Sequence, residues 1–217
     1  MRFYSPNWYL GFFRDLALDY WQLAGEEHDT SAEIALIEDF VELKAGDRVL
    51  DVFCGYGRHS LVYAERGMAV TAVDVAGSYI EALRGAALLQ GVSLRAVCSD
   101  VLSWEGEKGV YDLVVCMGNS IGYLNREQLG VFFGIIGGCL KGDGLFVFHT
   151  SVLAESVFPN LMEYDWKQVG DVTFLLKNTY WVEEGCLESE VRFIRGGTER
   201  EGRMYHYVYS LSELVHW

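Results

Sequence analysis

The chain has 217 residues, of which 51% are hydrophobic and 22% are charged. This composition can form a sizeable core and excludes global disorder, and the length suits one α/β domain with a small appendage. Lys and Arg number 17 against 31 Asp and Glu, a net charge of −14. Because such a chain is repelled by phosphate backbones and anionic lipid, we expect neither nucleic acid nor a membrane as its partner.

The amino-terminal residues lack the basic-then-apolar order of a signal peptide, and no apolar run is long enough to span a bilayer. The cysteines are odd in number and none forms a C-x-x-C pair, which predicts neither a disulfide framework nor a zinc site; they are Cys54, Cys98, Cys116, Cys139 and Cys186. We therefore expect a cytoplasmic protein with reduced thiols and no bound metal.

Two helices are predicted first. Residues 5–24 are aromatic and amphipathic, with a spacing typical of a helix that has a broad apolar face. Residues 30–43 follow as a second helix, which Thr30 or Ser31 can cap. Its predicted buried face consists of Ile34, Ile37, Phe40 and Val41.

Strands and helices then alternate up to residue 150. The predicted strands are 48–53, 69–73, 94–98, 111–117 and 145–149. The predicted helices are 58–66, 77–90 and 125–140, the last with Gln128 placed for a capping box. A turn is expected at 141–144. This order predicts a parallel sheet with helices on both faces.

After residue 150 the pattern changes to strands joined by short turns, which indicates an antiparallel meander. The expected strands are 172–180, 187–194 and 203–209. We therefore expect a core with amino-terminal helices over 1–150, a small β cap on the ligand side over 151–209, and the start of a final helix at 210–217.

The most informative motif is an apolar strand that runs into Gly55-Tyr56-Gly57 and then into a helix. Glycine allows a tight turn and lets a ligand approach the backbone closely. In open parallel sheets, ligands bind beyond the carboxyl ends of the strands. The strand–loop–helix order therefore predicts a ligand site at this loop.

Two acids follow the next two strands. Asp74 can accept hydrogen bonds from both hydroxyls of a ribose, and Asp100 can accept one from an adenine amine. The apolar Val75 and Val101 are placed to sandwich the base. For each acid alone, a helix cap or a solvated loop is the alternative interpretation.

Asp51, four residues before Gly55, decides between ligands. An acid beside the loop would repel the pyrophosphate of a dinucleotide, and Ser60 stands where a dinucleotide motif has its third glycine. S-adenosylmethionine carries an ammonium and a sulfonium but no phosphate. The charge pattern therefore favours S-adenosylmethionine over NAD.

These residues resemble the class I S-adenosylmethionine-dependent methyltransferases, and in particular a bacterial small-molecule branch of them. The matching segments are 53–59, which reads FCGYGRH, 119–123, which reads NSIGY, the aromatic residues at 8–9 and 12–13, and YSLSEL at 209–214. The resemblance implies a Rossmann-like sheet with helices on both faces, a three-stranded antiparallel cap, and S-adenosylmethionine as the cofactor, with S-adenosylhomocysteine as product.

The resemblance also implies site residues. The cofactor would be held by Asp51, Phe53, Gly55, Tyr56, Gly57, Asp74, Val75, Ser99, Asp100, Val101, Cys116 and Met117. The substrate or a lid would involve Trp8, Tyr9, Phe12, Asn119, Tyr123 and His206, with Tyr4 and Phe13 as further candidates for the lid. The packed face of a helix explains the amino-terminal aromatic residues equally well. His149 is the candidate general base, and His59 and His206 are alternatives that packing or an exposed strand position also explains.

The chain departs from this family in three ways. The family usually has Pro-Gly-Gly where this chain has Gly142-Asp143-Gly144, and an acid where it has His149. The family fold continues with two more strands beyond the position of Trp217, so those strands are expected to be absent here.

The predicted function is methylation of a small molecule at nitrogen or oxygen. A truncated or degenerate protein that binds S-adenosylmethionine without catalysis is the first alternative, and an NAD-dependent oxidoreductase is the second. A homodimer is compatible with the sequence, which does not identify the methyl acceptor.

Overall fold

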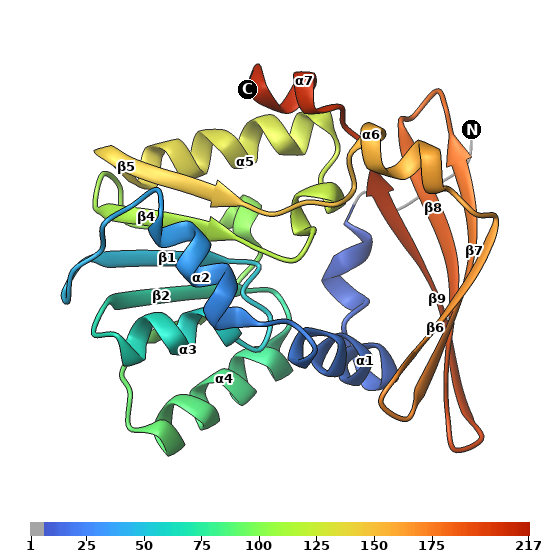
Figure 1. The fold of residues 1–217 in the computed structure, drawn as a ribbon, viewed down its shortest axis with the longest axis horizontal. Coiled ribbons are helices and arrows are strands. Elements are labelled where there is room, and N and C mark those ends of the chain that lie inside the picture. The colour runs from blue at the N-terminus through green and yellow to red at the C-terminus, as the bar shows by residue number, and fades with distance from the viewer. Residues whose placement is uncertain (1–6) are drawn as a thin grey trace. The chain divides into compact units, whose positions relative to one another are not determined.

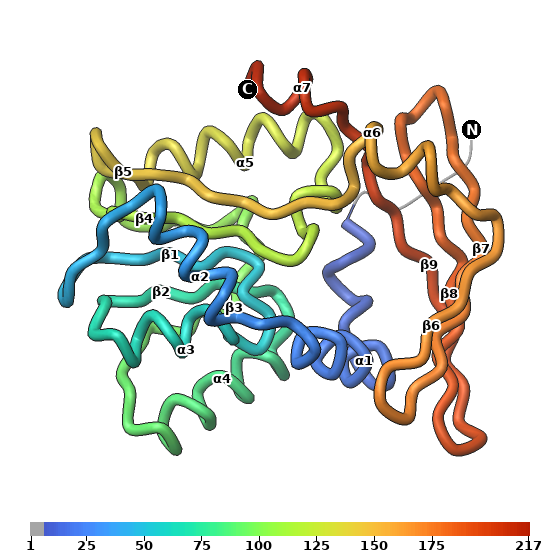
Figure 2. The backbone as a smooth tube through the Cα atoms, in the orientation of Figure 1, coloured from blue at the N-terminus to red at the C-terminus, as the bar shows by residue number. Residues whose placement is uncertain are grey.

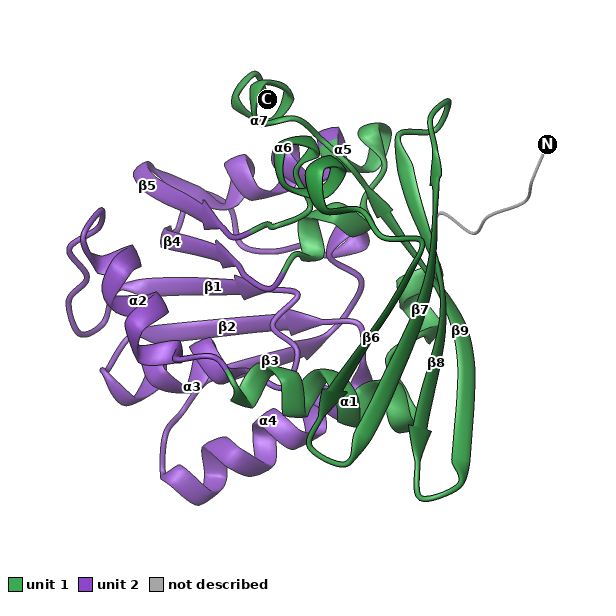
Figure 3. Cartoon of the chain, turned by 45° about the vertical axis from the view of Figure 1, so that its right-hand side comes forward, with its two compact units in different colours: residues 1–27, 119–129, 150–217 green, residues 28–118, 130–149 purple. Residues whose placement is uncertain are grey.

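The computed structural model describes residues 7–217, so Tyr4 and the first two residues of the helix expected at 5–24 lie outside the described residues. The chain divides into two compact units, coloured separately in Figure 3. The parallel-sheet unit comprises residues 28–118 and 130–149. The antiparallel-sheet unit comprises residues 119–129 and 150–217 together with the described part of residues 1–27.

The parallel-sheet unit contains the predicted parallel sheet. Its strands are β1 (Arg48–Val52), β2 (Ala69–Asp74), β3 (Arg95–Cys98), β4 (Tyr111–Cys116) and β5 (Leu140–Phe148), in the order β3-β2-β1-β4-β5 (Figure 1; Figure 2). All four strand pairs are parallel. The chain order reverses between β1 and β4, which makes the carboxyl ends of these two strands the switch point where such sheets bind ligands.

The start of β5 differs from the prediction. Leu140 pairs with Tyr111 and Leu145 with Leu113, so the predicted turn at 141–144 lies inside the strand as an irregularity. Four residues of β5 thus lie opposite one residue of β4, and β5 pairs with β4 on both sides of them.

Helices cover both faces of this sheet. They are α2 (Thr30–Glu38), α3 (Arg58–Glu65), α4 (Gly77–Gln90) and α5 (Arg126–Cys139). Residues of α2, α3, β1, β2 and β4 share one core cluster, against which Val147 of β5 packs. The neighbouring Phe146 contacts Phe132 of α5. Because adjacent residues of a strand point to opposite faces, α5 covers the face opposite α2 and α3.

Two of the three helix ends discussed here agree with the prediction from sequence. Helix α4 ends at Gly91, whose φ is +69°. Asn125 and Gln128 exchange the reciprocal hydrogen bonds of a capping box at the start of α5. The prediction that Thr30 or Ser31 caps α2 is wrong. Asp29, one residue before Thr30, caps the helix, and its carboxylate accepts from the N–H of Ala32.

Helix α2 is also shorter than predicted. It ends at Glu38, and Ile34 and Ile37 are buried as expected. Phe40, which lies beyond the helix, is 73% exposed, so its prediction as a core residue is wrong. Val41 is half-buried and packs against the core cluster from outside the helix.

The antiparallel-sheet unit has four consecutive strands. They are β6 (Tyr164–Val169), β7 (Val172–Trp181), β8 (Cys186–Arg195) and β9 (Thr198–Tyr207), paired in chain order. The sequence analysis missed β6, which is largely exposed. It also began β9 five residues late, because residues 199–203, all charged except Gly202, follow no hydrophobic pattern and are held in the strand by pairing with β8.

The single helix predicted for residues 5–24 is wrong. The described residues form a short 3-10 helix, η1 (Trp8–Gly11), and α1 (Asp15–Glu26). Arg14 between them is extended, and α1 begins with Asp15 at φ +50°. The guanidinium of Arg200 on β9 donates to the carbonyls of Phe12 and Arg14 and so takes up backbone acceptors at the break.

Helix α1 packs on one face of the antiparallel sheet through Tyr20, whose ring lies 4.5 Å from that of Phe174 and 5.5 Å from that of Phe193. The remaining short elements are η2 (Val101–Ser103), η3 (Ser120–Tyr123), α6 (Ala154–Val157), η4 (Phe158–Asn160) and α7 (Leu211–Val215). Helix α7 confirms the expected final helix and is capped by Ser210 and Glu213. No helix within residues 7–217 has the length and apolar character needed to cross a membrane.

Candidate functional site

The loop between β1 and α3 has an unusual backbone. Phe53, Gly55 and Gly57 all have positive φ, and Phe53 is one of few non-glycine residues in this conformation. At Gly57, φ is +83° and a Cβ atom would lie 2.3 Å from the side chain of Leu83 on α4. Only glycine satisfies both conditions. The loop is therefore pressed against α4 and turns tightly into α3.

Asp74 at the end of β2 supports this loop. One carboxylate oxygen accepts from the N–H of Gly55 at 2.9 Å and the other from the N–H of Ala76 at 2.8 Å. Burial raises the pKa of Asp74, while these backbone donors lower it. Each carboxylate oxygen has a second lone pair, so the predicted acceptance of ribose hydroxyls is compatible with these bonds.

Asp51 is the most unusual group of this unit. Its side chain is buried, and its carboxylate accepts a 2.6 Å hydrogen bond from the hydroxyl of Ser60. The pKa of Asp51 is raised to about 7, mainly by burial and in part by the negative charge of Asp74, against the opposing effects of Ser60 and Arg58. Ser60, which replaces the third glycine of a dinucleotide motif, thus donates a hydrogen bond to Asp51, the acid that disfavours a dinucleotide.

The third acid, Asp100, follows β3. Its carboxylate accepts from the N–H of Leu102 and caps η2, as the simpler interpretation of this residue predicted. The N–H of Ser99 donates to the carbonyl of Asp74, which links the carboxyl ends of β2 and β3. Val101 is buried and Val75 half-buried, so both apolar residues are in place beside the two acids.

The sheet brings most of the predicted cofactor residues to one edge. Asp51 is paired with Ala72 on one side and Val115 on the other, and Asp74 is paired with Cys98. Cys116 is buried at the end of β4, and Met117 follows it half-buried. Strand-end residues from β1, β2, β3 and β4 therefore share the carboxyl edge of the sheet, as does Tyr56 in the loop after β1.

His59 is held by an acid that the sequence analysis missed. Its Nε2 lies 2.8 Å from a carboxylate oxygen of Glu33 on α2, and the same oxygen accepts from Arg58 at 2.7 Å. Burial lowers the pKa of His59 to about 4. No local signal identifies Glu33, which is 26 residues away in the chain. The contact joins α2 to the start of α3.

His149, the predicted general base, is exposed directly after β5, and its backbone N–H donates to the carbonyl of Cys116. Its role in catalysis stays a prediction.

All six predicted substrate or lid residues belong to the antiparallel-sheet unit, and five of them form one cluster of rings. The ring of Trp8 lies 5.1 Å from that of Phe12, 5.0 Å from that of Tyr123 and 5.9 Å from that of His206. Tyr9 stacks on Tyr123 at 6.1 Å. We call Trp8, Tyr9, Phe12, Tyr123 and His206 the aromatic cluster. These residues come from η1, η3 and β9.

Asn119, the sixth predicted residue, has a different position. Its φ is +70°, and its side-chain oxygen accepts hydrogen bonds from the backbone N–H and the hydroxyl of Ser151. The contact ties the two segments by which the chain enters the antiparallel-sheet unit. Asn119 thereby has a structural function whether or not it meets a substrate.

Comparison with known proteins agrees with this geometry. Residues 49–144 match a family model described as a methyltransferase domain. An ubiquinone biosynthesis O-methyltransferase from Vibrio vulnificus is 34% identical over 110 residues, which are 48% of this chain and 47% of that protein. The chain spans about half the length of the curated relatives it matches.

Solved structures extend the likeness over most of the chain. A S-adenosylmethionine-dependent methyltransferase from Clostridium acetobutylicum has a TM-score of 0.72 at 18% identity, covering 91% of this chain and 82% of that one. An amino pentose methyltransferase from Micromonospora echinaspora, solved with S-adenosylmethionine bound, has a TM-score of 0.67 at 19% identity, covering 91% and 84%. The chain therefore has the class I methyltransferase fold, and its residues 49–144 are similar to a methyltransferase domain.

Proposed function

We propose that this protein is a S-adenosylmethionine-dependent methyltransferase that acts on a small molecule. The domain match supports the class of reaction. The relatives named above include an O-methyltransferase of ubiquinone biosynthesis and a methyltransferase of an amino sugar, which supports a small-molecule acceptor and leaves nitrogen and oxygen both open.

The observation that supports this proposal most strongly is the raised pKa of the buried Asp51. Because the pKa of this buried carboxylate is raised to about 7 despite the charge of Arg58, a further cation beside it would stabilise its ionised form. A ligand that places an ammonium group near Asp51 would supply that charge, whereas a diphosphate would be repelled by both Asp51 and Asp74. The methionine portion of S-adenosylmethionine carries such an ammonium group.

The residues at this edge fit the remainder of the cofactor. Gly55 and Gly57 would present backbone groups to the methionine portion, Asp74 would accept from the ribose hydroxyls, and Asp100 with Val101 would contact the adenine. When bound, S-adenosylmethionine supplies a methyl group already activated by its sulfonium. The remaining task of the chain is to position a nucleophile in line with that methyl group and to exclude water.

The direct test is calorimetry with S-adenosylmethionine, S-adenosylhomocysteine and NAD. We expect both sulfur nucleosides to bind and NAD not to bind. Binding of NAD alone would contradict the proposal and favour the oxidoreductase alternative. A screen for transfer of a labelled methyl group to small molecules then separates an enzyme from a protein that binds the nucleosides without catalysis.

A further inference from the structure

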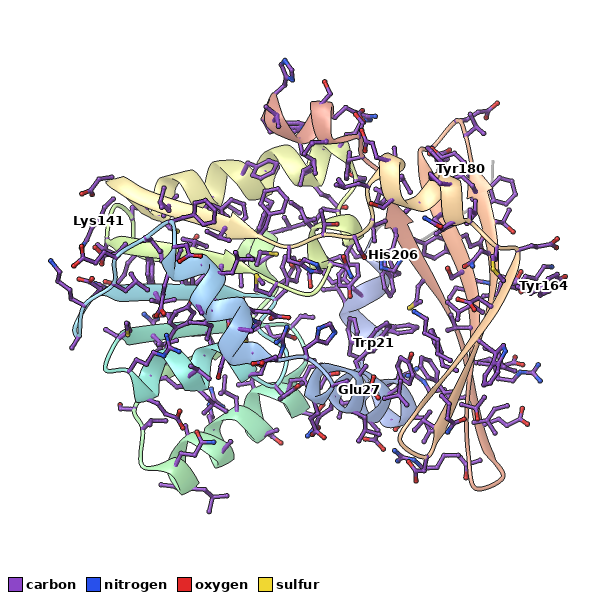
Figure 4. All side chains as sticks on the ribbon, viewed as in Figure 1. Trp21, Glu27, Lys141, Tyr164, Tyr180 and His206 are labelled. Carbon is purple, nitrogen blue, oxygen red and sulfur yellow. The ribbon has the colours of Figure 1, made fainter. Side chains whose placement is uncertain are left out.

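Helix α1 packs on one face of the antiparallel sheet, where Tyr20 contacts Phe174. We call the side of the sheet that faces away from α1 the exposed face. Figure 4 labels Tyr164 of β6, which lies on the opposite side of the sheet from Trp21 of α1. Tyr164 is 61% exposed, and Trp166, two residues later on the same strand, is 65% exposed. Large exposed rings that share one face indicate an interaction surface.

Two rows of side chains cross the exposed face. They lie opposite Phe174, because adjacent residues of a strand point to opposite faces and residues two apart share a face. Paired residues of neighbouring strands lie side by side, so the pairing of β6 to β9 places four side chains in each row. The first row consists of Tyr164, Lys177, Glu190 and Arg203, and the second row consists of Trp166, Leu175, Arg192 and Glu201. All of them except Trp166 help to line a groove of about 600 Å³.

The charges of the two rows alternate in sign. On β8, the first row has an acid, Glu190, and the second row has a base, Arg192. On β9 the order is reversed, with Arg203 in the first row and Glu201 in the second. Ion pairs join Arg192 to Glu201 at 2.5 Å and Arg203 to Glu190 at 3.9 Å. Each of these charges therefore has a neighbour of opposite sign both along its strand and across to the next strand.

The exposed face is also less acidic than the chain as a whole. The two rows contain three basic residues, Lys177, Arg192 and Arg203, and two acidic ones, whereas the whole chain has a net charge of −14. Two copies of so acidic a chain repel one another, and they approach most easily through a face whose charges are balanced.

We propose that the exposed face binds the same face of a second copy of this chain, around a two-fold axis that lies between the two rows and runs parallel to them. Such an axis places the first row of each copy against the second row of the other. Glu190 then faces Arg192 of the second copy, and Arg203 faces Glu201 of the second copy. The alternation of charge thus makes the face complementary to itself.

The aromatic residues supply the apolar part of this contact. At the edge of the sheet, Tyr164 faces Trp166 of the second copy, and the symmetry repeats the pair. Lys177 faces Leu175, whose surface its aliphatic chain covers. Tyr and Trp are enriched in interfaces, whereas charged pairs mainly set the orientation. Because charged side chains make up much of the contact, we expect a dissociation constant on the order of 10 µM, so that most copies are free at about 1 µM.

Sedimentation velocity of the full chain, at concentrations of about 1–200 µM, tests the inference. We expect a monomer at the lowest concentration and a dimer at the highest. Arg192→Glu places an acid against Glu190 of the second copy, so this variant should lose more than about tenfold in affinity. Lys167→Glu is the matched control, because it makes the same change of charge on the face that carries Phe174, and it should leave the dimer intact. A monomer at every concentration overturns the inference and leaves the exposed face to a different protein.

A pair of charge reversals tests the position of the axis. Glu190→Arg alone should also be monomeric, because it places two bases against each other. An equal mixture of Arg192→Glu and Glu190→Arg should form a one-to-one heterodimer, since every acid at these two positions again faces a base. An axis parallel to the strands, between β8 and β9, would instead leave both new charges facing like charges on β9. A heterodimer in the mixture supports the inference, and a monomeric mixture overturns it.

The aromatic contact is tested by Trp166→Ala, which should weaken the dimer about tenfold. Phe40→Ala is the control, because Phe40 is also largely exposed but lies beyond α2, and it should leave the dimer unchanged. Dimerisation of Trp166→Ala as tight as that of the wild-type protein overturns the inference, since the contact would then not include β6. All of these measurements are made without S-adenosylmethionine, so their outcome does not depend on the proposed function.

Discussion

In the parallel-sheet unit, hydrogen bonds hold the acids at the strand ends: Asp51 accepts from Ser60, and Asp74 accepts from two backbone amides. In the antiparallel-sheet unit, ring packing predominates, and Trp8 contacts Phe12, Tyr123 and His206. Hydrogen bonds fix the direction of a charged group, whereas packed rings fix the shape of a surface. Substitutions in the two regions should therefore have different effects.

The largest effect on the parallel-sheet unit is expected for Gly57→Ala, in the loop between β1 and α3. A Cβ would meet Leu83 at 2.3 Å, and alanine is disfavoured at φ +83°. We expect a loss of about 3 kcal/mol in the free energy of unfolding and no detectable binding of S-adenosylmethionine. Denaturant melts and calorimetry measure the two effects. Gly91→Ala, at φ +69° with open space around it, is the control and should lose only about 1 kcal/mol.

Asp51→Asn should raise the stability of the fold and lower the affinity for S-adenosylmethionine. Because the pKa of Asp51 is raised to about 7 in the fold, the folded state binds more protons than the unfolded state between about pH 4 and 7. Stability contributed by this group is therefore lost as the pH rises through that window. We expect the variant to gain about 2–4 kcal/mol at pH 8, and to lose about 100-fold in affinity for S-adenosylmethionine.

The raised pKa of Asp51 also predicts that protons are released when S-adenosylmethionine binds. If the ligand's ammonium stabilises ionised Asp51, binding at pH 6 should release protons, whereas binding at pH 8 should release few. Calorimetry in buffers of different ionisation enthalpy measures this. Proton uptake at pH 6, or release that persists in Asp51→Asn, would contradict the assignment.

Glu33→Gln tests a contact that joins two helices of the same parallel-sheet unit. The substitution weakens the contacts with Arg58 and His59 that join α2 to α3, and should cost about 1–2 kcal/mol. Since Glu33 holds the fold rather than the ligand, we expect the affinity for S-adenosylmethionine to change less than threefold. A large loss of affinity with unchanged stability would place Glu33 in the cofactor site instead.

The smallest effect is expected for Glu201→Gln on the antiparallel sheet. Glu201 pairs with Arg192 across β8 and β9, and both side chains are largely exposed. Exposed ion pairs contribute little, so the change in unfolding free energy should stay within about 0.5 kcal/mol. A loss above 2 kcal/mol in a thermal melt would show that this face is buried in the protein as it exists in solution.

Local signals predicted much of the fold. Gly91 ended a helix as expected because few other residues adopt positive φ easily, and the capping box of Asn125 and Gln128 requires only four consecutive residues. Strand β6 and the first half of β9 were missed because most of their residues are exposed and pairing with a neighbouring strand holds them. The break before α1 depends on Arg200, which is 186 residues from Arg14 along the chain.

The sequence by itself determined the parallel sheet, its glycine loop and the acids at its strand ends, because each is encoded by short-range periodicity and by residues adjacent to a strand. Only the tertiary structure decided that Ser60 holds Asp51, that Glu33 holds His59, and that Trp8, Tyr123 and His206 pack in one cluster of rings. Those contacts join residues between 9 and 198 positions apart in the chain. Burial and pairing of that kind arise only when distant elements pack, and no local pattern records them.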